Sequence, residues 1–568
     1  MSVHVPRKKK LLPAGMYREH ERSFLKPRCG RARLRVALAF PNTYHVGMSN
    51  LGFQLVYRIL TLHPEVCCER FFLPDQAPRA AGRGGGLRSI ESGAYLHRFD
   101  CIAFSLSFES DYLNVVRMLA LGGVPALRSA RSRSAPLLLA GGVAVSMNPE
   151  PLADIFDLFA AGEAEAVLPD VIARALECLQ RGRARGLCPE DFADIGGIYV
   201  PGLAAPVYDG QRLLGMRSQA SAGLPVIARR PADADTCHGS SCILSPHTQF
   251  ADMALVEVSR GCPHGCRFCA VGSLYPPYRR RSLAILQEEI EPLLQQNVRI
   301  GLLGAAVSDH PDLVALMRCI VGRGGHISIS SLRADALSSE MVALLTACGH
   351  TTFTIAPESA TQRMRDVLGK GISHADIMHA TDLFAEHGVS SIRLYFMIGL
   401  PCEYDEDCVA IAQLAREVAA RYRTACGGRD RLRRLTLSVS PFVPKPFTPF
   451  QWHPFETPVS LKRKLALLKG ELRTEKKIVL SCDSPRLSLV QALLSTGDRR
   501  MTEILLSAHA LQGNWTRAFR QNGFDPEASV CRQRSRDEYL PWDVLDHGID
   551  KAMLWREYRK AIEAGSGC

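Results

Sequence analysis

The chain has 568 residues, of which 46% are hydrophobic and 22% are charged, and its formal net charge is +12. This composition excludes an intrinsically disordered chain, and the length exceeds one ordinary core, so two to four domains are expected. No run of about 18 apolar residues occurs, which excludes a membrane-spanning helix, and no membrane partner is expected.

The positive charge is concentrated at one end. Residues 1–35 carry eleven Lys and Arg against two acidic residues, so the rest of the chain has a net charge of only about +3. Residues 1–30 are therefore expected to be a solvated, disordered tail, with an RNA-binding arm as the alternative. The nineteen cysteines are scattered, and no apolar signal segment follows the first basic residues. We expect reduced thiols and a cytoplasmic location.

Short apolar strands alternate with helical patterns in the first third of the chain. The expected strands are residues 33–40, 101–106, 136–140 and 155–160, and the expected helices are residues 51–60 and 112–121. This alternation predicts a parallel sheet covered by helices, so residues 31–200 are expected to form an α/β, doubly wound, Rossmann-like domain. Residues 201–248 mix Pro, Gly and polar residues without a period and are expected to be a linker.

A second alternation occupies residues 249–455. Its expected strands are residues 254–259, 298–304, 326–332, 351–356, 391–398 and 434–440. The segments between them carry apolar stripes at helical spacing, so six strand–helix units are predicted. A segment rich in Pro and aromatic residues, 442–454, is expected to be an extended strap. Residues 456–568 are expected to be mainly helical and to end in an amphipathic segment at 549–562.

A cysteine motif follows the first strand of the second alternation. Residues 257–269 read EVSRGCPHGCRFC, so Cys262, Cys266 and Cys269 are spaced four and three apart in a loop opened by Gly and Pro. A structural metal site is usually closed by four ligands, whereas three thiolates leave a site open for chemistry. Three of four zinc ligands, or three ordinary buried cysteines, are the alternatives.

With Phe268 directly before the third cysteine, this loop resembles the CxxxC-x-aromatic-C loop of the radical SAM superfamily. The six strand–helix units match that family's six-stranded partial barrel, with the loop at the C-terminal edge of the strands. The resemblance implies a 4Fe–4S cluster whose fourth iron is chelated by the amino and carboxylate groups of S-adenosylmethionine. It also implies one-electron cleavage to methionine and a 5′-deoxyadenosyl radical, with an external electron donor such as a flavodoxin or ferredoxin.

Three later strand ends resemble the family's segments that receive the methionine, ribose and adenine of the cofactor. By this resemblance Phe268 and Gly304 belong to the cofactor site, and Glu358 and Ser359 are candidates for ribose or amino-group contacts. Gly399 would allow close backbone approach beside the adenine. The alternative for Glu358 is a cap on the following helix.

For three basic residues near these strand ends, the sequence indicates a role less specifically. Arg333 either reaches the cofactor carboxylate or forms an ion pair with Asp335 or a neighbour. Lys370 and Arg365 are expected on a solvated helix end.

Further segments resemble the subgroup of radical SAM proteins that carry an N-terminal cobalamin-binding-like domain, closest to a branch of unknown substrate. They are residues 40–52, 148–154, 275–282 and 441–452. A base-off cobalamin domain carries Asp-x-His-x-x-Gly after its first strand, but this chain has Asn42, His45 and Gly47 there, without the aspartate that would orient the imidazole. Cobalamin binding therefore stays open, against a Rossmann-like domain that has lost the corrin and serves as a platform.

The function expected from these motifs is a radical SAM enzyme that modifies an unidentified substrate. A cobalamin-dependent radical SAM methyltransferase is one alternative. A non-catalytic zinc protein or an electron-transfer iron–sulfur protein is the other.

Overall fold

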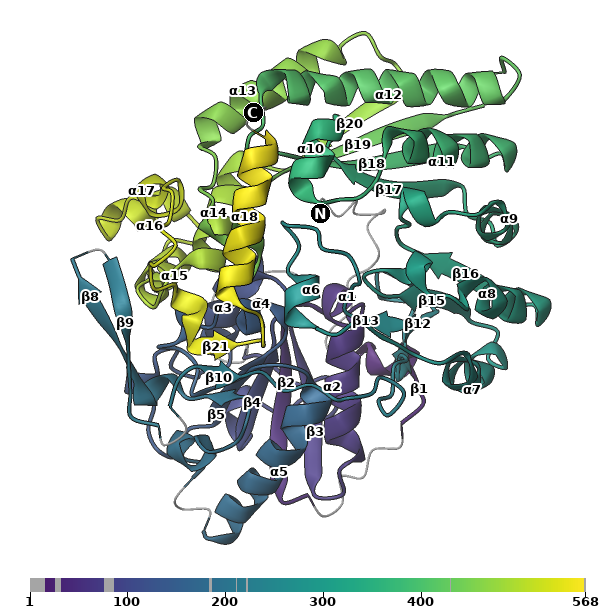
Figure 1. Ribbon diagram of the computed structural model, residues 1–568. Coiled ribbons are helices and arrows are strands. Elements are labelled where there is room, and N and C mark those ends of the chain that lie inside the picture. Colours follow the sequence, from purple (N-terminus) through teal and green to yellow (C-terminus); the bar gives the residue numbers. More distant parts are fainter. Residues whose placement is uncertain are drawn as a thin grey trace.

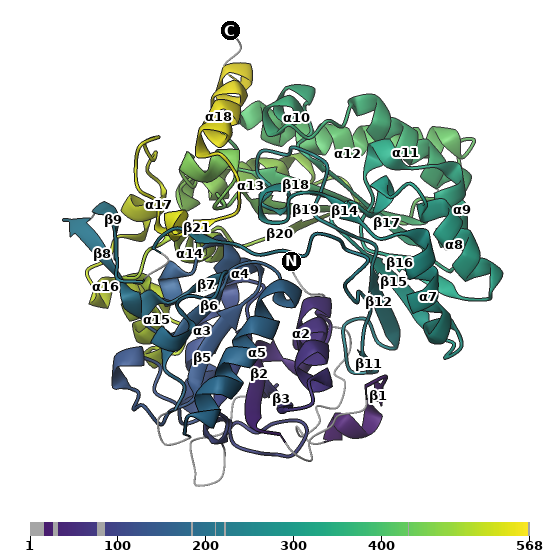
Figure 2. The same cartoon turned by 60° about the horizontal axis from the view of Figure 1, so that its bottom comes forward.

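Two sets of parallel strands organise the chain, one in each half. The computed structural model describes residues 16–25, 32–75, 86–182, 186–210, 212–220, 223–429 and 431–565. Most of the predicted basic tail, residues 1–30, lies outside these ranges. Figure 1 shows the N-terminal sheet below the second set of strands, with the C-terminal helices alongside both, and Figure 2 shows the same arrangement after rotation.

The N-terminal sheet has six strands in the order β3-β2-β4-β5-β6-β7, all parallel except β7, which is antiparallel to β6. The strands are β2 (Leu34–Thr43), β3 (Val66–Leu73), β4 (Cys101–Ser105), β5 (Leu137–Gly141), β6 (Leu158–Ala160) and β7 (Ile198–Tyr199). The four strands predicted in this region are all present.

Helices cover both faces of this sheet. They are α1 (Tyr44–Gly47), α2 (Leu51–Leu62), α3 (Tyr112–Leu121), α4 (Val143–Met147) and α5 (Ala164–Gln180). Successive side chains of a strand point to opposite faces. Val36 and Leu38 of β2 belong to the core that contains residues of α2 and α5, whereas Ala37 and Ala39 belong to the core that contains residues of α3. The predicted doubly wound, Rossmann-like architecture is confirmed.

Strand β3 was not predicted, because two charged residues interrupt its apolar pattern. All eight of its residues are buried, including Glu69 and Arg70. The Arg70 guanidinium binds the carboxylates of Glu21 at 2.7 Å and Glu91 at 2.6 Å. These carboxylates, distant in sequence, compensate the buried charge and allow the strand to lie inside the domain.

Residues 201–248, predicted as a linker, contain regular elements. β8 (Ala204–Asp209) and β9 (Arg212–Ser218) form an antiparallel hairpin. β10 (Val226–Ile227) pairs with β21 (Leu545–Asp546) near the C-terminus, and β11 (Ile243–Leu244) pairs with β1 (Arg22–Ser23) near the N-terminus. The segment thus joins parts of the chain that are far apart in sequence.

The second set of strands forms an open barrel in two parallel sheets, which an isolated bridge between Leu332 and Ile355 connects. The first sheet contains β12 (Met253–Glu257), β15 (Arg299–Leu303) and β16 (His326–Ile329). The second contains β17 (Thr352–Glu358), β18 (Ser391–Ile398), β19 (Arg434–Pro441) and β20 (Ile478–Cys482). The first six strands confirm the six predicted units of a partial barrel.

The outer layer of the barrel is helical. It consists of α7 (Leu283–Leu294), α8 (Leu313–Gly322), α9 (Ser339–Ala347), α10 (Gln362–Leu368), α11 (His374–Glu386), α12 (Asp405–Ala425) and α13 (Pro458–Glu471) (Figure 1). Their buried faces share one hydrophobic core with the outward side chains of the strands.

The barrel extends beyond residue 455, where it was predicted to end, because β20 pairs with β19. The rest of the chain is helical as predicted, with α14 (Pro485–Thr496), α15 (Met501–Ala510), α16 (Trp515–Gln521), α17 (Pro526–Val530) and α18 (Lys551–Gly565). α18 covers most of the amphipathic segment predicted at 549–562.

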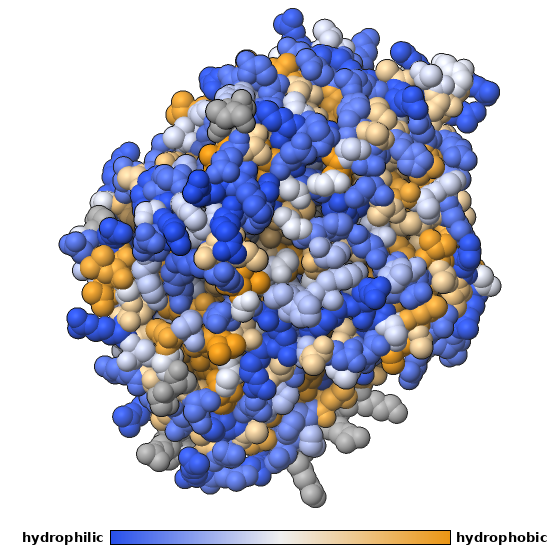
Figure 3. Space-filling view, in the orientation of Figure 1, coloured by the Kyte–Doolittle hydropathy of each residue, from blue (hydrophilic) through white to orange (hydrophobic). Residues whose placement is uncertain are grey.

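The face of the molecule seen in Figure 3 is mainly hydrophilic, with hydrophobic side chains in small separate groups. Within the described residues, no helix combines the length and the apolar character needed to cross a bilayer.

Candidate active site

The three-cysteine loop lies at the C-terminal edge of the barrel strands. It follows β12 and the short β13 (Ser259–Arg260), and it leads into α6 (Val271–Leu274). Gly261 opens the loop with a φ of +83°, and a Cβ atom there would lie 2.5 Å from the Tyr275 carbonyl oxygen. Only glycine fits this close approach with this backbone conformation.

The three thiols are near enough to influence one another. Burial, with smaller contributions from Cys266 and Cys262, raises the pKa of Cys269 to about 11. Burial also raises the pKa of Cys266, whereas the positive charges of Lys370 and Arg333 act in the opposite direction. The backbone amides of His264 and Val271 donate to the sulfurs of Cys262 and Cys269. Amide donors and nearby cations both stabilise thiolates that bind an anionic cluster.

A cluster and a single metal ion require different arrangements of ligands. Among the described residues, no three His, Cys, Asp or Glu side chains are gathered closely enough to hold one metal ion. In a cuboidal cluster each thiolate binds a different iron, so its ligands stand farther apart than those around a single zinc ion. The zinc site that the sequence left as an alternative stays a prediction, which metal analysis of the reconstituted protein tests.

Three elements brace this loop from outside. His264 contacts Asp309, after β15, with 2.6 Å between Nε2 and Oδ1. The Arg267 guanidinium donates to the Asp366 carbonyl at the end of α10 at 2.8 Å, and it lies 3.2 Å from the Glu557 carboxylate of α18. The C-terminal helix thus helps to hold a loop nearly 300 residues away in sequence.

Phe268 and Glu358 are brought together by Lys370. The Lys370 ammonium lies 3.1 Å from Oε1 of Glu358 and 5.8 Å from the centre of the Phe268 ring. Glu358 ends β17 at a shift in strand register and has a φ of +65°. Burial raises the pKa of Glu358, and the positive charge of Lys370 acts in the opposite direction.

Two predictions about this corner of the site are wrong. Lys370 and Arg365 were expected on a solvated helix end, but only 9% of Lys370 and 1% of Arg365 are exposed. The Arg365 guanidinium donates to the carbonyl oxygens of three residues, Ser359, Ala360 and Ile372. The alternative that Glu358 caps the next helix is also wrong, because the side chain of Thr361 caps α10.

The other predicted cofactor residues lie at the same edge of the barrel. A Cβ on Gly304 would lie 2.9 Å from Oγ of Ser259, so this glycine packs against the start of the cysteine loop. Ser359 is buried, and its carbonyl oxygen accepts from Arg365 at 3.1 Å. Gly399 has a φ of +77°, and its amide donates to the Glu403 carboxylate at 2.6 Å. Their contacts with a cofactor remain predictions.

Arg333 forms the ion pair that the sequence offered as an alternative. Its guanidinium lies 2.7 Å from the Asp335 carboxylate and donates to the Lys370 carbonyl at 3.2 Å. The arginine therefore supports the segment that carries Lys370.

A cavity of about 420 Å³ lies where the N-terminal sheet meets the barrel. Its walls are mostly apolar and include Ala103, Ser105 and Leu139 of β4 and β5, with Tyr275 and Gly304 on the barrel side.

The glycine pair after β5 forms part of the cavity wall. Gly142 has a φ of +107°, and a Cβ there would lie 2.5 Å from the Leu106 carbonyl oxygen. The Gly141-Gly142 turn is therefore a tight strand exit that also opens onto the cavity.

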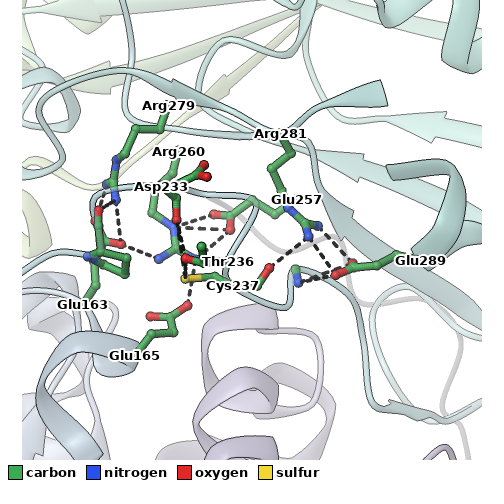
Figure 4. A network of polar contacts seen from close by, with 12 residues as sticks. Glu163, Glu165, Asp233, Thr236, Cys237, Glu257, Arg260, Arg279, Arg281 and Glu289 are labelled. Carbon is green, nitrogen blue, oxygen red and sulfur yellow. Dashed lines mark hydrogen bonds and ion pairs between the residues drawn. The ribbon is translucent and has the colours of Figure 1, made fainter. Parts of the chain in front are cut away.

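A polar network that the sequence did not predict closes one side of this cavity (Figure 4). The Arg260 guanidinium lies 2.5 Å from Glu163, 3.0 Å from Glu165 and 2.7 Å from Glu257. Arg279 also binds Glu163. Because Arg260 precedes Gly261 and Cys262, the network ties the base of the cysteine loop to the N-terminal end of α5. The run of three arginines at 279–281 was the only sequence signal for it.

His45 points away from the cavity. Its Nδ1 lies 3.0 Å from the His247 carbonyl oxygen, and His45 is not among the residues that line the cavity. The histidine that most resembles a cobalt ligand in the sequence therefore contacts a backbone carbonyl outside the cavity lining.

Two family descriptions match this chain. Residues 52–201 match "Radical SAM proteins, N-terminal", and residues 256–415 match "Radical SAM superfamily". The second match contains the three cysteines and the other predicted cofactor residues.

Several relatives are similar over large parts of the chain. An uncharacterized protein of Methanocaldococcus jannaschii is 28% identical over 83% of this chain and 90% of its own length. The ribosomal protein uS12 methylthiotransferase RimO of Desulfotalea psychrophila is 23% identical over 44% of this chain and 56% of its own. The solved structure of the cobalamin-dependent S-adenosylmethionine radical enzyme OxsB, with aqua-cobalamin and S-adenosylmethionine bound, has 16% identity and a TM-score of 0.46 over 67% of this chain. The present chain spans about half of that structure, 52%.

Proposed function

Because the chain belongs to the radical SAM superfamily, we propose that Cys262, Cys266 and Cys269 hold a 4Fe–4S cluster and that the protein is a radical enzyme acting on a substrate still to be identified. When bound with S-adenosylmethionine, such a cluster supplies the electron that cleaves the sulfonium to methionine and a 5′-deoxyadenosyl radical. An external donor such as a flavodoxin or ferredoxin would provide that electron.

The protein's own residues position the cofactors and shield them. The braces from Asp309, α10 and α18 hold the loop in one conformation, as a preorganised site requires. Lys370 adds positive charge beside the thiolates and favours the ionised form of Glu358 at the end of β17, where a carboxylate can accept hydrogen bonds from a ribose or an amino group. Phe268 shields one side of this ion pair.

One observation carries the proposal. Three mutually interacting thiols stand at the catalytic edge of a parallel barrel, with amide donors to two sulfurs and two cations nearby. A closed structural zinc site needs four ligands, whereas the cysteine motif supplies three.

Anaerobic reconstitution tests this proposal. The wild-type protein should bind about four irons per chain and form 5′-deoxyadenosine when reduced with S-adenosylmethionine. Cys262→Ala, Cys266→Ala and Cys269→Ala should each abolish nucleoside formation. Cys319→Ala removes a thiol on the outer helix α8 and should leave both readouts unchanged. Bound zinc without any nucleoside product would refute the proposal in favour of the non-catalytic alternative.

A second candidate is the cobalamin-dependent methyltransferase. The apolar cavity between the two domains favours it, because its walls come from the strand ends where doubly wound domains bind their ligands. The Gly141-Gly142 turn lines the cavity without side chains, so a flat cofactor could approach the backbone there. Since His45 binds the His247 carbonyl, a corrin here would lack that histidine as an axial ligand. Corrin absorbance that stays with the purified protein would support this candidate.

An RNA substrate is not supported beyond the basic composition of residues 1–35. Most of that segment lies outside the described residues, so RNA binding stays a prediction.

A further inference from the structure

The inner face of the barrel carries a row of polar side chains that the cofactor proposal does not use. On β17, β18 and β19, buried residues alternate with partly exposed ones. The buried set packs against the outer helices, as the rings of Phe353 and Phe384 do at 5.2 Å. Because successive side chains of a strand point to opposite faces, the partly exposed set faces the interior of the barrel.

Within that set, Thr354, Arg393 and Thr436 form one row across the three strands. Arg393 is paired in register with Thr354 on one side and with Thr436 on the other. Registered residues of neighbouring parallel strands point to the same face of the sheet, so one guanidinium stands between two hydroxyl groups. All five guanidinium N–H groups and both hydroxyls can donate hydrogen bonds.

Arg393 has no compensating partner among the described residues. Its Nε is buried and unpaired, and neither an ion pair nor a hydrogen bond to its guanidinium is found among those residues. The buried arginines Arg70, Arg281 and Arg365 differ, because carboxylates or carbonyl oxygens bind each of them. A partly buried positive charge without a partner lowers stability, unless a ligand supplies the missing negative charge.

The acidic residues on or next to these strands already have partners. Glu358 binds Lys370, and Asp483 accepts a hydrogen bond from Ser440 at 2.7 Å. An anion that binds Arg393 would therefore come from outside the described chain.

We propose that Thr354, Arg393 and Thr436 bind an oxyanion of the substrate, either a carboxylate or a phosphate monoester. This inference rests on the proposed function and assigns the chemical class of its substrate. A guanidinium fork matches the planar geometry of a carboxylate or phosphate, and the flanking hydroxyls complete the set of donors.

The position of the row separates this anion from the cofactor. Arg393 lies five residues before the end of β18 at Ile398, which corresponds to roughly 16 Å along an extended strand. The cofactor's own carboxylate is expected at the cysteine loop, beyond the strand ends. The substrate is then an elongated molecule whose anionic end lies deep in the barrel, while its reacting carbon lies near the loop.

The test measures anion binding to anaerobically reconstituted protein, with inorganic phosphate and succinate as probes. Wild-type protein should bind one of the two in calorimetry, and the preferred probe tells phosphate from carboxylate. Arg393→Met should weaken that binding about tenfold or more, because hydrogen bonds to charged groups are lost. Arg393→Lys should retain part of the affinity, and Thr354→Val and Thr436→Val should each lower it about threefold.

Stability and cofactor binding provide the controls. Arg393→Met should melt at the same temperature as the wild type or higher, because it removes an uncompensated charge, whereas a purely structural arginine would make the variant less stable. Arg434→Met, at the exposed start of β19, should leave probe binding unchanged. The inference would be overturned if neither probe binds the wild type, or if Arg393→Met and Arg434→Met lose probe binding equally. Weakened S-adenosylmethionine binding in Arg393→Met would overturn it as well. Probe binding should persist in Cys262→Ala, so failure of the cluster proposal is recognised separately.

Discussion

Lys370 and Glu358 form a buried ion pair beside the cysteine loop, and the pair makes the lysine sensitive to substitution. Their side chains are only 10% and 15% exposed. Lys370→Met leaves the carboxylate without its cation, which should lower the free energy of unfolding by about 3 kcal/mol at pH 8. Lys462→Met, on an exposed face of α13, is the matched control and should have little effect.

The pH dependence of this loss follows from the pKa of Glu358. Because burial raises that pKa above its ordinary value of 4.5, the folded state holds the proton more tightly than the unfolded state. The stability contributed by the carboxyl group is therefore complete below pH 4.5 and is lost as the pH rises through the folded pKa. Removing Lys370 raises this pKa further. The difference in melting temperature between wild type and Lys370→Met should be larger at pH 8 than at pH 5, and a constant difference would contradict the assigned pairing.

Single residues differ in how well the sequence predicts their roles. The three cysteines could be identified because their partners lie within eight residues and the spacing itself carries the signal. The roles of Lys370 and Arg365 could not, because burial of a long basic side chain depends on where distant carboxylates and carbonyl oxygens lie. Arg393 gave no signal in the sequence, since its inward direction follows from strand register alone.

At the scale of elements, the network around Arg260 joins β13 and β14 (Arg279–Arg280) of the barrel to the start of α5. Glu163 accepts from both Arg260 and Arg279 and is 3% exposed, whereas Glu165 contacts Arg260 alone and is 17% exposed. Glu163→Ala should therefore lower the free energy of unfolding by about 3 kcal/mol, because Arg279 loses its carboxylate partner and Arg260 loses one of its three. Glu165→Ala should cost about 1 kcal/mol or less.

Thermal melting and limited proteolysis of the segment 223–250 measure this difference. Glu163→Ala should melt earlier and be cleaved faster there, because the barrel is then less firmly attached to the N-terminal domain. Equal effects of the two substitutions would show that the network does not hold the domains together. Iron retention should fall in Glu163→Ala if the same network also steadies the base of the cysteine loop.

Strands and helices were predictable where apolar periodicity was uninterrupted. The first six strands of the barrel carry apolar residues either in short runs or at every second position, and they match their predicted positions within a few residues. β3 was missed because its buried Glu69 and Arg70 read as a surface segment, and their compensation comes from residues far along the chain. β20 was missed because only Ile478 of its five residues is fully buried. Pairing with β19 stabilises it, and no local pattern encodes that pairing.

At the scale of the whole molecule, residues of both parallel assemblies line the cavity, so ligand binding there would depend on both. The sequence predicted each assembly separately but not how they meet, because the contacts at the junction join residues about 100 positions apart or more, such as Arg260 with Glu163 and Lys445 with Glu109. The cysteine loop stands at this junction as well. A reaction at the loop would therefore take place next to any ligand bound in the cavity.

Filling the cavity should separate the two candidate functions. Ser105 lies at the end of β4 and lines the cavity, so Ser105→Trp places a large ring there while the strand itself remains intact. If the protein binds a corrin in this cavity, the variant should lose corrin absorbance and methyl transfer but keep its iron and still form 5′-deoxyadenosine, because the cysteine loop is unchanged. Ala510→Trp makes a similar addition on an exposed face of α15 and should change none of these readouts. Full corrin retention in Ser105→Trp would place the corrin elsewhere, whereas loss of iron as well would mean that the cavity wall supports the loop directly.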